Sequence, residues 1–129
     1  MTSKEKGYMG EQAVCEELIR KGYNILERNF TVKGGEIDII ACNDEFIVFV
    51  EVKTRSKNSL VSAFEAVTAS KKKFIVRTAS AYSCKYPLKY QPRFDVAEVI
   101  IINNKISEIN YIENAFDTTD YDYTLIMCE

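Results

Sequence analysis

The chain has 129 residues, of which 47% are hydrophobic and 28% are charged, and its formal net charge is −2. This is a common size for one compact domain, and with no membrane-length apolar run and no signal-peptide pattern we expect a cytoplasmic protein that makes no membrane contact. The sequence has no histidine, which excludes histidine-based zinc sites and Ser-His-Asp or Cys-His nucleophilic systems. The four cysteines lack Cys-x-x-Cys spacing, which indicates reduced thiols.

An amphipathic helix is predicted near the start of the chain. The segment Thr2–Glu5 has the pattern of a capping box, and Gly22 stops the helix after Lys21. Glu11 has the helical spacing of the apolar stripe, so it projects from the buried side of the helix. The stripe consists of Tyr8, Val14, Cys15 and Leu18. A carboxylate there needs a partner, unless it reaches solvent or pairs with a nearby lysine or arginine.

A strand from about Tyr23 to Lys33 is followed by a predicted β-hairpin that covers Glu36–Lys53. The polar pair Asn43-Asp44 interrupts two β-rich runs, and such a pair is a hairpin signal. If these two residues form the whole loop, Cys42 faces Glu45 across the hairpin.

Four charged residues of this hairpin are predicted to share one face of the sheet. In the register given above, Asp38 lies opposite Phe49, and Glu36 lies opposite Glu51. Because side chains alternate along a strand, these residues share a face with Lys53, and Asp38 and Glu51 are diagonal neighbours about 7–8 Å apart. Two carboxylates at this separation can bracket one cation. Oxygen ligands without histidine favour Mg²⁺ or Mn²⁺ over zinc.

These charges also have a purely structural interpretation. Charged residues at strand ends are commonly solvated and prevent aggregation, and the pair Glu51 and Lys53 fits that description. The run Phe46–Val52 argues for a functional site, since it is apolar on both faces, as in a covered strand, and yet ends in charges. We therefore favour metal-assisted hydrolysis, with no catalysis as the alternative.

The second half of the chain is predicted to contain one helix and two strands. The helix runs from about Ala63 to Tyr82, and the strands cover about Phe94–Ile102 and Lys105–Ile112, joined by a turn at Asn103-Asn104. The predicted fold is therefore α/β, with a mixed central sheet flanked by helices and the order α-β-β-β-α-β-β. Residues 115–129 form an acidic tail or an added edge strand.

Charge is strongly segregated along the chain. Residues 1–70, 71–93 and 94–129 carry net charges of −2, +7 and −7. The basic middle segment is interleaved with aromatic residues, a composition that suits contacts with nucleic-acid phosphates and bases. Two alternatives are a solvated helix face with tyrosines in the core, and an acidic tail that folds over the basic segment and masks it.

Several motifs resemble those of the YraN-like family of small bacterial proteins. They are Gly10-Glu11, Gly22–Asn29, Gly35–Ala41, Val48–Arg55 and Arg93–Val96, and the resemblance runs from about Gly7 to Ile102. That family is assigned to the PD-(D/E)XK nuclease superfamily, and the spacing is also similar to that of archaeal Holliday junction resolvases. The resemblance implies a restriction-endonuclease-like domain over residues 1–114. Ile37 stands where the superfamily motif has proline.

The resemblance also implies roles for individual residues. Asp38, Glu51 and the Val52 carbonyl would hold Mg²⁺ or Mn²⁺, Lys53 would orient the attacking water, and these positions match the superfamily motif. Glu11 matches an acidic residue on the first helix of many members, and it would complete the metal's outer shell or help to bind a second ion.

A nucleic-acid substrate follows from the same resemblance. The expected activity is endonucleolytic hydrolysis of DNA, including branched or structured DNA, and the resolvases make a homodimer an option. Arg55, Lys71 and Lys72 are candidates for contacts with the DNA backbone. The alternative is a non-catalytic nucleic-acid-binding or interaction module that retains the nuclease fold.

Overall fold

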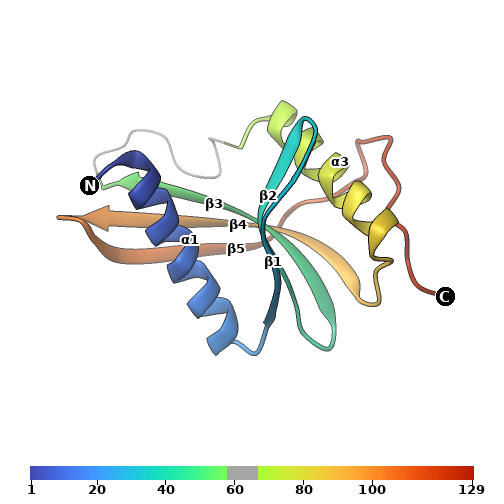
Figure 1. Cartoon of the computed structure of the whole chain (residues 1–129), viewed down its shortest axis with the longest axis horizontal. Coiled ribbons are helices and arrows are strands. Elements are labelled where there is room, and N and C mark those ends of the chain that lie inside the picture. The colour runs from blue at the N-terminus through green and yellow to red at the C-terminus, as the bar shows by residue number, and fades with distance from the viewer. Residues whose placement is uncertain (58–66) are drawn as a thin grey trace.

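The structure, a computed structural model, describes residues 1–57 and 67–129 of the chain. Within these ranges two helices and five strands follow one another along the chain (Figure 1). They are α1 (Ser3–Arg20), β1 (Asn24–Val32), β2 (Gly35–Cys42), β3 (Phe46–Ser56), α3 (Ala69–Lys85), β4 (Gln91–Ile102) and β5 (Lys105–Phe116). The predicted α/β class and the order α-β-β-β-α-β-β are confirmed.

The strands form one mixed sheet in the order β1-β2-β3-β4-β5. Strands β3 and β4 are parallel, and the other neighbouring pairs are antiparallel. A parallel pair needs a crossover connection, and α3 lies in the connection between β3 and β4. The mixed sheet follows from this single crossover.

The two helices pack on opposite faces of the sheet. Val50 packs in one buried cluster with Leu18 of α1, whereas its neighbour Phe49 packs in another with Val76 of α3. Strand β3 is therefore covered on both sides, as its apolar run predicts. This cover extends to Glu51, and the residues that follow in β3 are partly exposed.

Two glycines allow the helices to approach the sheet closely. A side chain at Gly10 of α1 would collide with Thr54 of β3, and a side chain at Gly35 of β2 would collide with Thr78 of α3. Each glycine directly precedes an acidic residue of the predicted site. The close approaches therefore set how near these acidic residues lie to the neighbouring elements.

The hairpin turn between β2 and β3 differs from the prediction. Cys42 pairs with Ile47 rather than Glu45, so the register is displaced by two residues and the connection is longer. The side-chain oxygen of Asn43 accepts hydrogen bonds from the N–H groups of Glu45 (2.9 Å) and Phe46 (2.7 Å), which stabilises this turn. A displacement of two residues leaves Asp38, Glu51 and Lys53 on their predicted common face.

The second helix begins later than predicted. Thr68 caps α3, which starts at Ala69, and the Thr68 hydroxyl accepts a hydrogen bond from the Lys71 N–H (3.3 Å). Of the predicted extension that starts at Ala63, residues 63–66 lie outside the described residues. The turn at Asn103-Asn104 is confirmed, since both residues have positive φ and Ile102 pairs with Lys105.

The acidic tail lies against α3 and the loop that follows it (Figure 1). The Leu88 N–H donates to the Ile126 carbonyl (2.8 Å), and the Ser80 hydroxyl donates to the Thr124 carbonyl (2.6 Å). Strand β5 extends to Phe116, four residues beyond the predicted end of this strand at about Ile112. Whether the tail masks the basic segment stays a prediction.

None of the helices in the described ranges is long and apolar enough to cross a membrane. All four cysteines are free, in agreement with the prediction of reduced thiols.

Candidate active site

The candidate site lies where β2 and β3 separate. The last pair of their ladder is Ile39 with Val50, whereas β3 stays paired with β4 as far as Ser56. Just past the end of the ladder, the Val52 N–H donates a hydrogen bond to Asp38 Oδ2 (2.8 Å). The Asp38 carboxylate therefore takes the place of the next backbone acceptor and leaves its second oxygen for another partner.

Glu51 is a buried carboxylate held by two lysines. Only 5% of the residue is exposed, and its Oε1 lies 3.2 Å from Lys53 Nζ and 3.0 Å from Lys71 Nζ. Lys53 comes from the same strand, whereas Lys71 comes from the first turn of α3. Two ammonium groups thus share one carboxylate oxygen.

Asp38 has a strongly raised pKa. Burial and then the charge of Glu51 raise the pKa of Asp38 to about 7, although the hydrogen bond from the Val52 N–H opposes the shift. Too little positive charge therefore surrounds the ionised Asp38 carboxylate, even though two lysines contact Glu51. Raised carboxyl pKa values of this kind concentrate at functional sites, because a bound cation or a proton-transfer role requires such a cluster.

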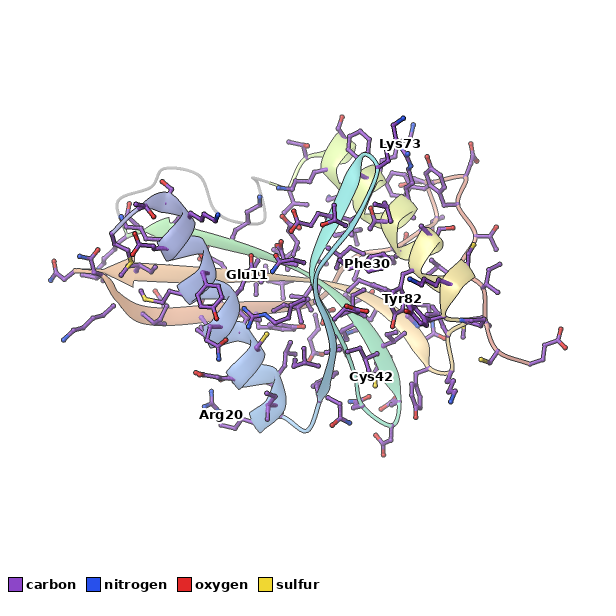
Figure 2. The ribbon with its side chains drawn as sticks, viewed as in Figure 1. Glu11, Arg20, Phe30, Cys42, Lys73 and Tyr82 are labelled. Atoms are coloured by element: carbon purple, nitrogen blue, oxygen red, sulfur yellow. The ribbon has the colours of Figure 1, made fainter. Side chains whose placement is uncertain are left out.

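Glu11 of α1 (labelled in Figure 2) has Glu36 and Glu51 among its electrostatic neighbours. Burial raises the pKa of Glu11, and the charges of Glu36 and Glu51 add to the shift. A hydrogen bond from the Asn29 side chain and the charge of Arg28 oppose it. The structure therefore brings Glu11 into electrostatic contact with the carboxylates of the hairpin.

The acidic side chains are not gathered tightly around one point. Among the described residues, no three His, Cys, Asp or Glu side chains form a group that could hold a metal ion. The oxygen donors that remain for a single ion are the carboxylates of Asp38 and Glu51 and a backbone carbonyl such as that of Val52.

The three candidates for DNA contacts have different surroundings. Lys71 contacts Glu51 and is part of the cluster. Arg55 forms an ion pair with Glu98, with Nε 2.9 Å from Oε2, and Lys72 Nζ lies 5.7 Å from the centre of the Phe116 ring. Binding of nucleic acid by these residues stays a prediction.

Sequence reasoning missed Asn29 and Arg28 as contributors to the site. Asn29 has a φ of 52°, and its side chain hydrogen-bonds to Glu11. Arg28 Nη1 donates to Gln12 (2.8 Å), while its Nε and Nη2 are buried without a hydrogen-bond partner among the described residues. Both residues lie in the Gly22–Asn29 motif, so the motif was the available signal, although it did not reveal their contacts.

Comparison with known proteins establishes the family. A family model described as "Uncharacterised protein family UPF0102" matches residues 10–99. The chain belongs to this family. The match includes Glu11, Asp38, Glu51 and Lys53, and it confirms the YraN-like resemblance at the level of the family, whose description names no activity.

Relatives in this family align over most of their length. A UPF0102 protein of Clostridioides difficile is 45% identical over 117 residues, which cover 90% of this chain and 100% of the relative. One of Caldanaerobacter subterraneus is 44% identical, covering 90% of this chain and 98% of the relative. One of Alkaliphilus metalliredigens is 47% identical, covering 88% and 99%.

Proposed function

We propose that this protein is a Mg²⁺-dependent nuclease that hydrolyses phosphodiester bonds of DNA. The observation that carries the proposal is the meeting of Asp38, Glu51 and Lys53 where β2 and β3 separate. A hollow of about 410 Å³ opens beside Asp38 and Glu51, between β2 and the start of α3. Carboxylates, an ammonium group and an open hollow together suit hydrolysis of a phosphate ester.

The donor set suits a hard divalent cation. It consists of oxygen ligands only, and the raised pKa of Asp38 reflects a lack of positive charge around the carboxylates. Asp38, Glu51 and the Val52 carbonyl would hold Mg²⁺ or Mn²⁺, and Glu11 would complete the outer shell of the metal. Such a cation, when bound, supplies positive charge at the phosphate and lowers the pKa of a coordinated water.

The lysines act on the water and the phosphate. Burial and the neighbouring Lys71 lower the pKa of Lys53, so this ammonium group exchanges protons more readily than an exposed lysine. Lys53 orients the attacking water by a hydrogen bond. Lys71 lies at the hollow, where it can bind a phosphate oxygen of the substrate.

Cleavage assays test the proposal directly. Labelled single-stranded, duplex, flap and four-way-junction DNA are incubated with Mg²⁺ or Mn²⁺. We expect Asp38→Asn and Lys53→Met each to reduce the cleavage rate at least about a hundredfold. The matched controls Asp44→Asn and Lys105→Met change an exposed turn residue and the exposed first residue of β5, and both should retain activity. Cleavage that survives both site substitutions would overturn the proposal.

A non-catalytic nucleic-acid-binding module is the second candidate. It is favoured by the two lysines that already neutralise Glu51, and by the absence of a three-residue metal group in the described part of the chain. Calorimetry with Mg²⁺ and Mn²⁺ separates the candidates. Salt-sensitive DNA binding without metal binding would support this module, because phosphate contacts release counterions whether or not cleavage occurs.

A further inference from the structure

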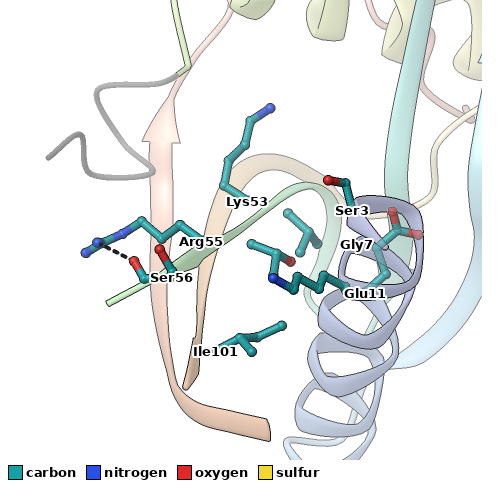
Figure 3. Close-up of a pocket in the computed structure, with 10 residues that line it drawn as sticks. Ser3, Gly7, Glu11, Lys53, Arg55, Ser56 and Ile101 are labelled. Carbon is teal, nitrogen blue, oxygen red and sulfur yellow. Dashed lines mark hydrogen bonds between the residues drawn. The ribbon is translucent and has the colours of Figure 1, made fainter. Parts of the chain in front are cut away.

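A second hollow lies on the α1 side of β3, next to the candidate active site (Figure 3). Its volume is about 390 Å³, and residues 52–56 of β3 form one wall. The facing wall comes from α1, with Ser3, Lys6, Gly7 and Glu11. Because Glu11, Val52 and Lys53 belong both to this hollow and to the candidate active site, the two sites are contiguous.

One edge of the β3 wall of this hollow pairs with no described strand, and we call it the open edge. Beyond Val50, β3 pairs with β4 on one side, while its ladder with β2 has ended. The Val52 N–H points to the β2 side, where it binds Asp38. Since backbone groups alternate between the two edges of a strand, the Thr54 N–H points to the same side. A strand edge with free N–H groups can bind an anion or another backbone.

The side chains of the hollow suit a phosphate. Lys6 forms no ion pair with any described residue, whereas Lys53 and Arg55 of the wall are paired with Glu51 and Glu98. Lys6 is therefore the cation of the hollow that can serve a ligand without breaking a described ion pair. The Thr54 hydroxyl lies against Gly10 of α1 in the wall of the hollow, where it is buried and lacks a hydrogen-bond partner among the described residues. A buried hydroxyl without a partner is uncommon, because it costs free energy relative to a hydrogen-bonded one.

Gly7 supplies an independent observation. Glycine in a helix interior costs about 1 kcal/mol relative to alanine. Gly10 has a packing reason, since a side chain there would collide with Thr54, but a side chain at Gly7 would meet no described residue within 4 Å. Packing of the described residues therefore does not explain the cost of a glycine at the mouth of the hollow.

We propose that this hollow binds a phosphodiester group of a nucleic-acid strand, next to the phosphate that the Asp38 and Glu51 cluster cleaves. The inference rests on the proposed nuclease function and adds a path for the substrate. The strand crosses the open edge of β3, with one phosphate beside Lys6 and Gly7 and the neighbouring phosphate beside Lys53.

Binding measurements without metal test this inference separately from catalysis. Fluorescence anisotropy in EDTA gives the affinity for labelled single-stranded DNA, single-stranded RNA and duplex DNA. We expect Gly7→Glu, which fills the mouth with negative charge, to weaken binding about tenfold or more, and Gly7→Ala to weaken it less while raising the melting temperature. Lys6→Gln should weaken binding about threefold to tenfold and reduce the slope of log affinity against log salt by about one. Lys4→Gln is the matched control, because Lys4 lies on a different side of α1 and should keep the wild-type affinity and slope.

Each outcome bears on the inference. Wild-type affinity in both Gly7→Glu and Lys6→Gln, with both variants folded by circular dichroism, would overturn it. Failure of the wild-type protein to bind any of the three probes would also overturn it. If these variants lose binding while Asp38→Asn still cleaves DNA, the hollow binds nucleic acid but the proposed catalytic cluster is wrong. The relative affinities for the DNA and RNA probes identify which nucleic acid the hollow prefers.

Discussion

Two groups of buried charges in this protein differ in how fully they are satisfied. Asp95 in β4 is completely buried, and Arg93 binds its carboxylate with Nε at 2.9 Å from Oδ1 and Nη2 at 2.9 Å from Oδ2. The Tyr111 hydroxyl (2.5 Å) and the Asn114 N–H (2.9 Å) also donate to it. By contrast, the Asp38 carboxylate receives one hydrogen bond from a described residue and faces a second carboxylate, that of Glu51.

This difference separates the Arg93–Asp95 ion pair from the proposed active site. A buried charge with a full set of partners stabilises one packing arrangement and has no oxygen left for a ligand. A cluster with an incomplete set stays costly until a cation or substrate arrives, which is typical of active sites. Position alone would not distinguish them, since Asp95 and Asp38 both lie in the central sheet.

The largest expected effect is a loss of stability when the ion pair of Arg93 with Asp95 is broken. Arg93→Met leaves Asp95 buried without its cation, so we expect a loss of about 3–5 kcal/mol in the free energy of unfolding, measured by urea denaturation. Tyr111→Phe removes only one hydrogen bond and should cost about 1 kcal/mol. If the free energy of unfolding falls by less than about 1 kcal/mol in both variants, the ion pair of Arg93 with Asp95 does not stabilise the fold.

Removal of a negative charge from the cluster of Asp38 and Glu51 should instead raise the free energy of unfolding. The folded pKa of Asp38, about 7, lies above its ordinary value of 3.8, so between pH 4 and pH 7 the folded protein keeps a proton that the unfolded chain has lost. The stability of the wild-type protein therefore falls as the pH rises through this window. In EDTA at pH 8, the free energy of unfolding of Asp38→Asn should be about 2–3 kcal/mol higher than that of the wild type. Near pH 4 the two proteins should differ little. An equal difference at both pH values would contradict the charge argument.

Metal should reverse this instability only where the cluster is intact. At a Mg²⁺ concentration ten times the dissociation constant, bound metal stabilises the folded state by about 1.4 kcal/mol, seen as a higher melting temperature. We expect this increase in the wild type and in the control Asp44→Asn, and none in Asp38→Asn. An identical increase in all three proteins would indicate that Mg²⁺ binds elsewhere.

Strand alternation was sufficient to predict which residues share the site, although the turn was wrong. A two-residue error in register preserves the face of each side chain, so Asp38, Glu51 and Lys53 converge in either register. The turn was mispredicted because the Asn43 side chain bonds to two N–H groups, a contact that a dipeptide pattern does not reveal.

Contacts between distant segments were beyond sequence reasoning. The ion pair of Lys71 with Glu51 depends on how α3 docks on the sheet, and the sequence contains no signal for that distance. The left-handed backbone of Asn29 is equally hidden, since asparagine tolerates that conformation without requiring it.

The smallest expected effect concerns Asn29, which holds Glu11 beside the cluster. Asn29→Gly keeps a residue that accepts the positive φ but removes the side-chain hydrogen bond to Glu11. We expect Mg²⁺ affinity, measured by calorimetry, to fall about threefold, with a change in stability below about 1 kcal/mol. Asn114→Gly is the matched control, because Asn114 has the same φ of 52° but contacts Asp95 through its backbone N–H, which glycine retains. Equal losses of metal affinity in the two variants would mean that the backbone, rather than the contact with Glu11, accounts for the effect.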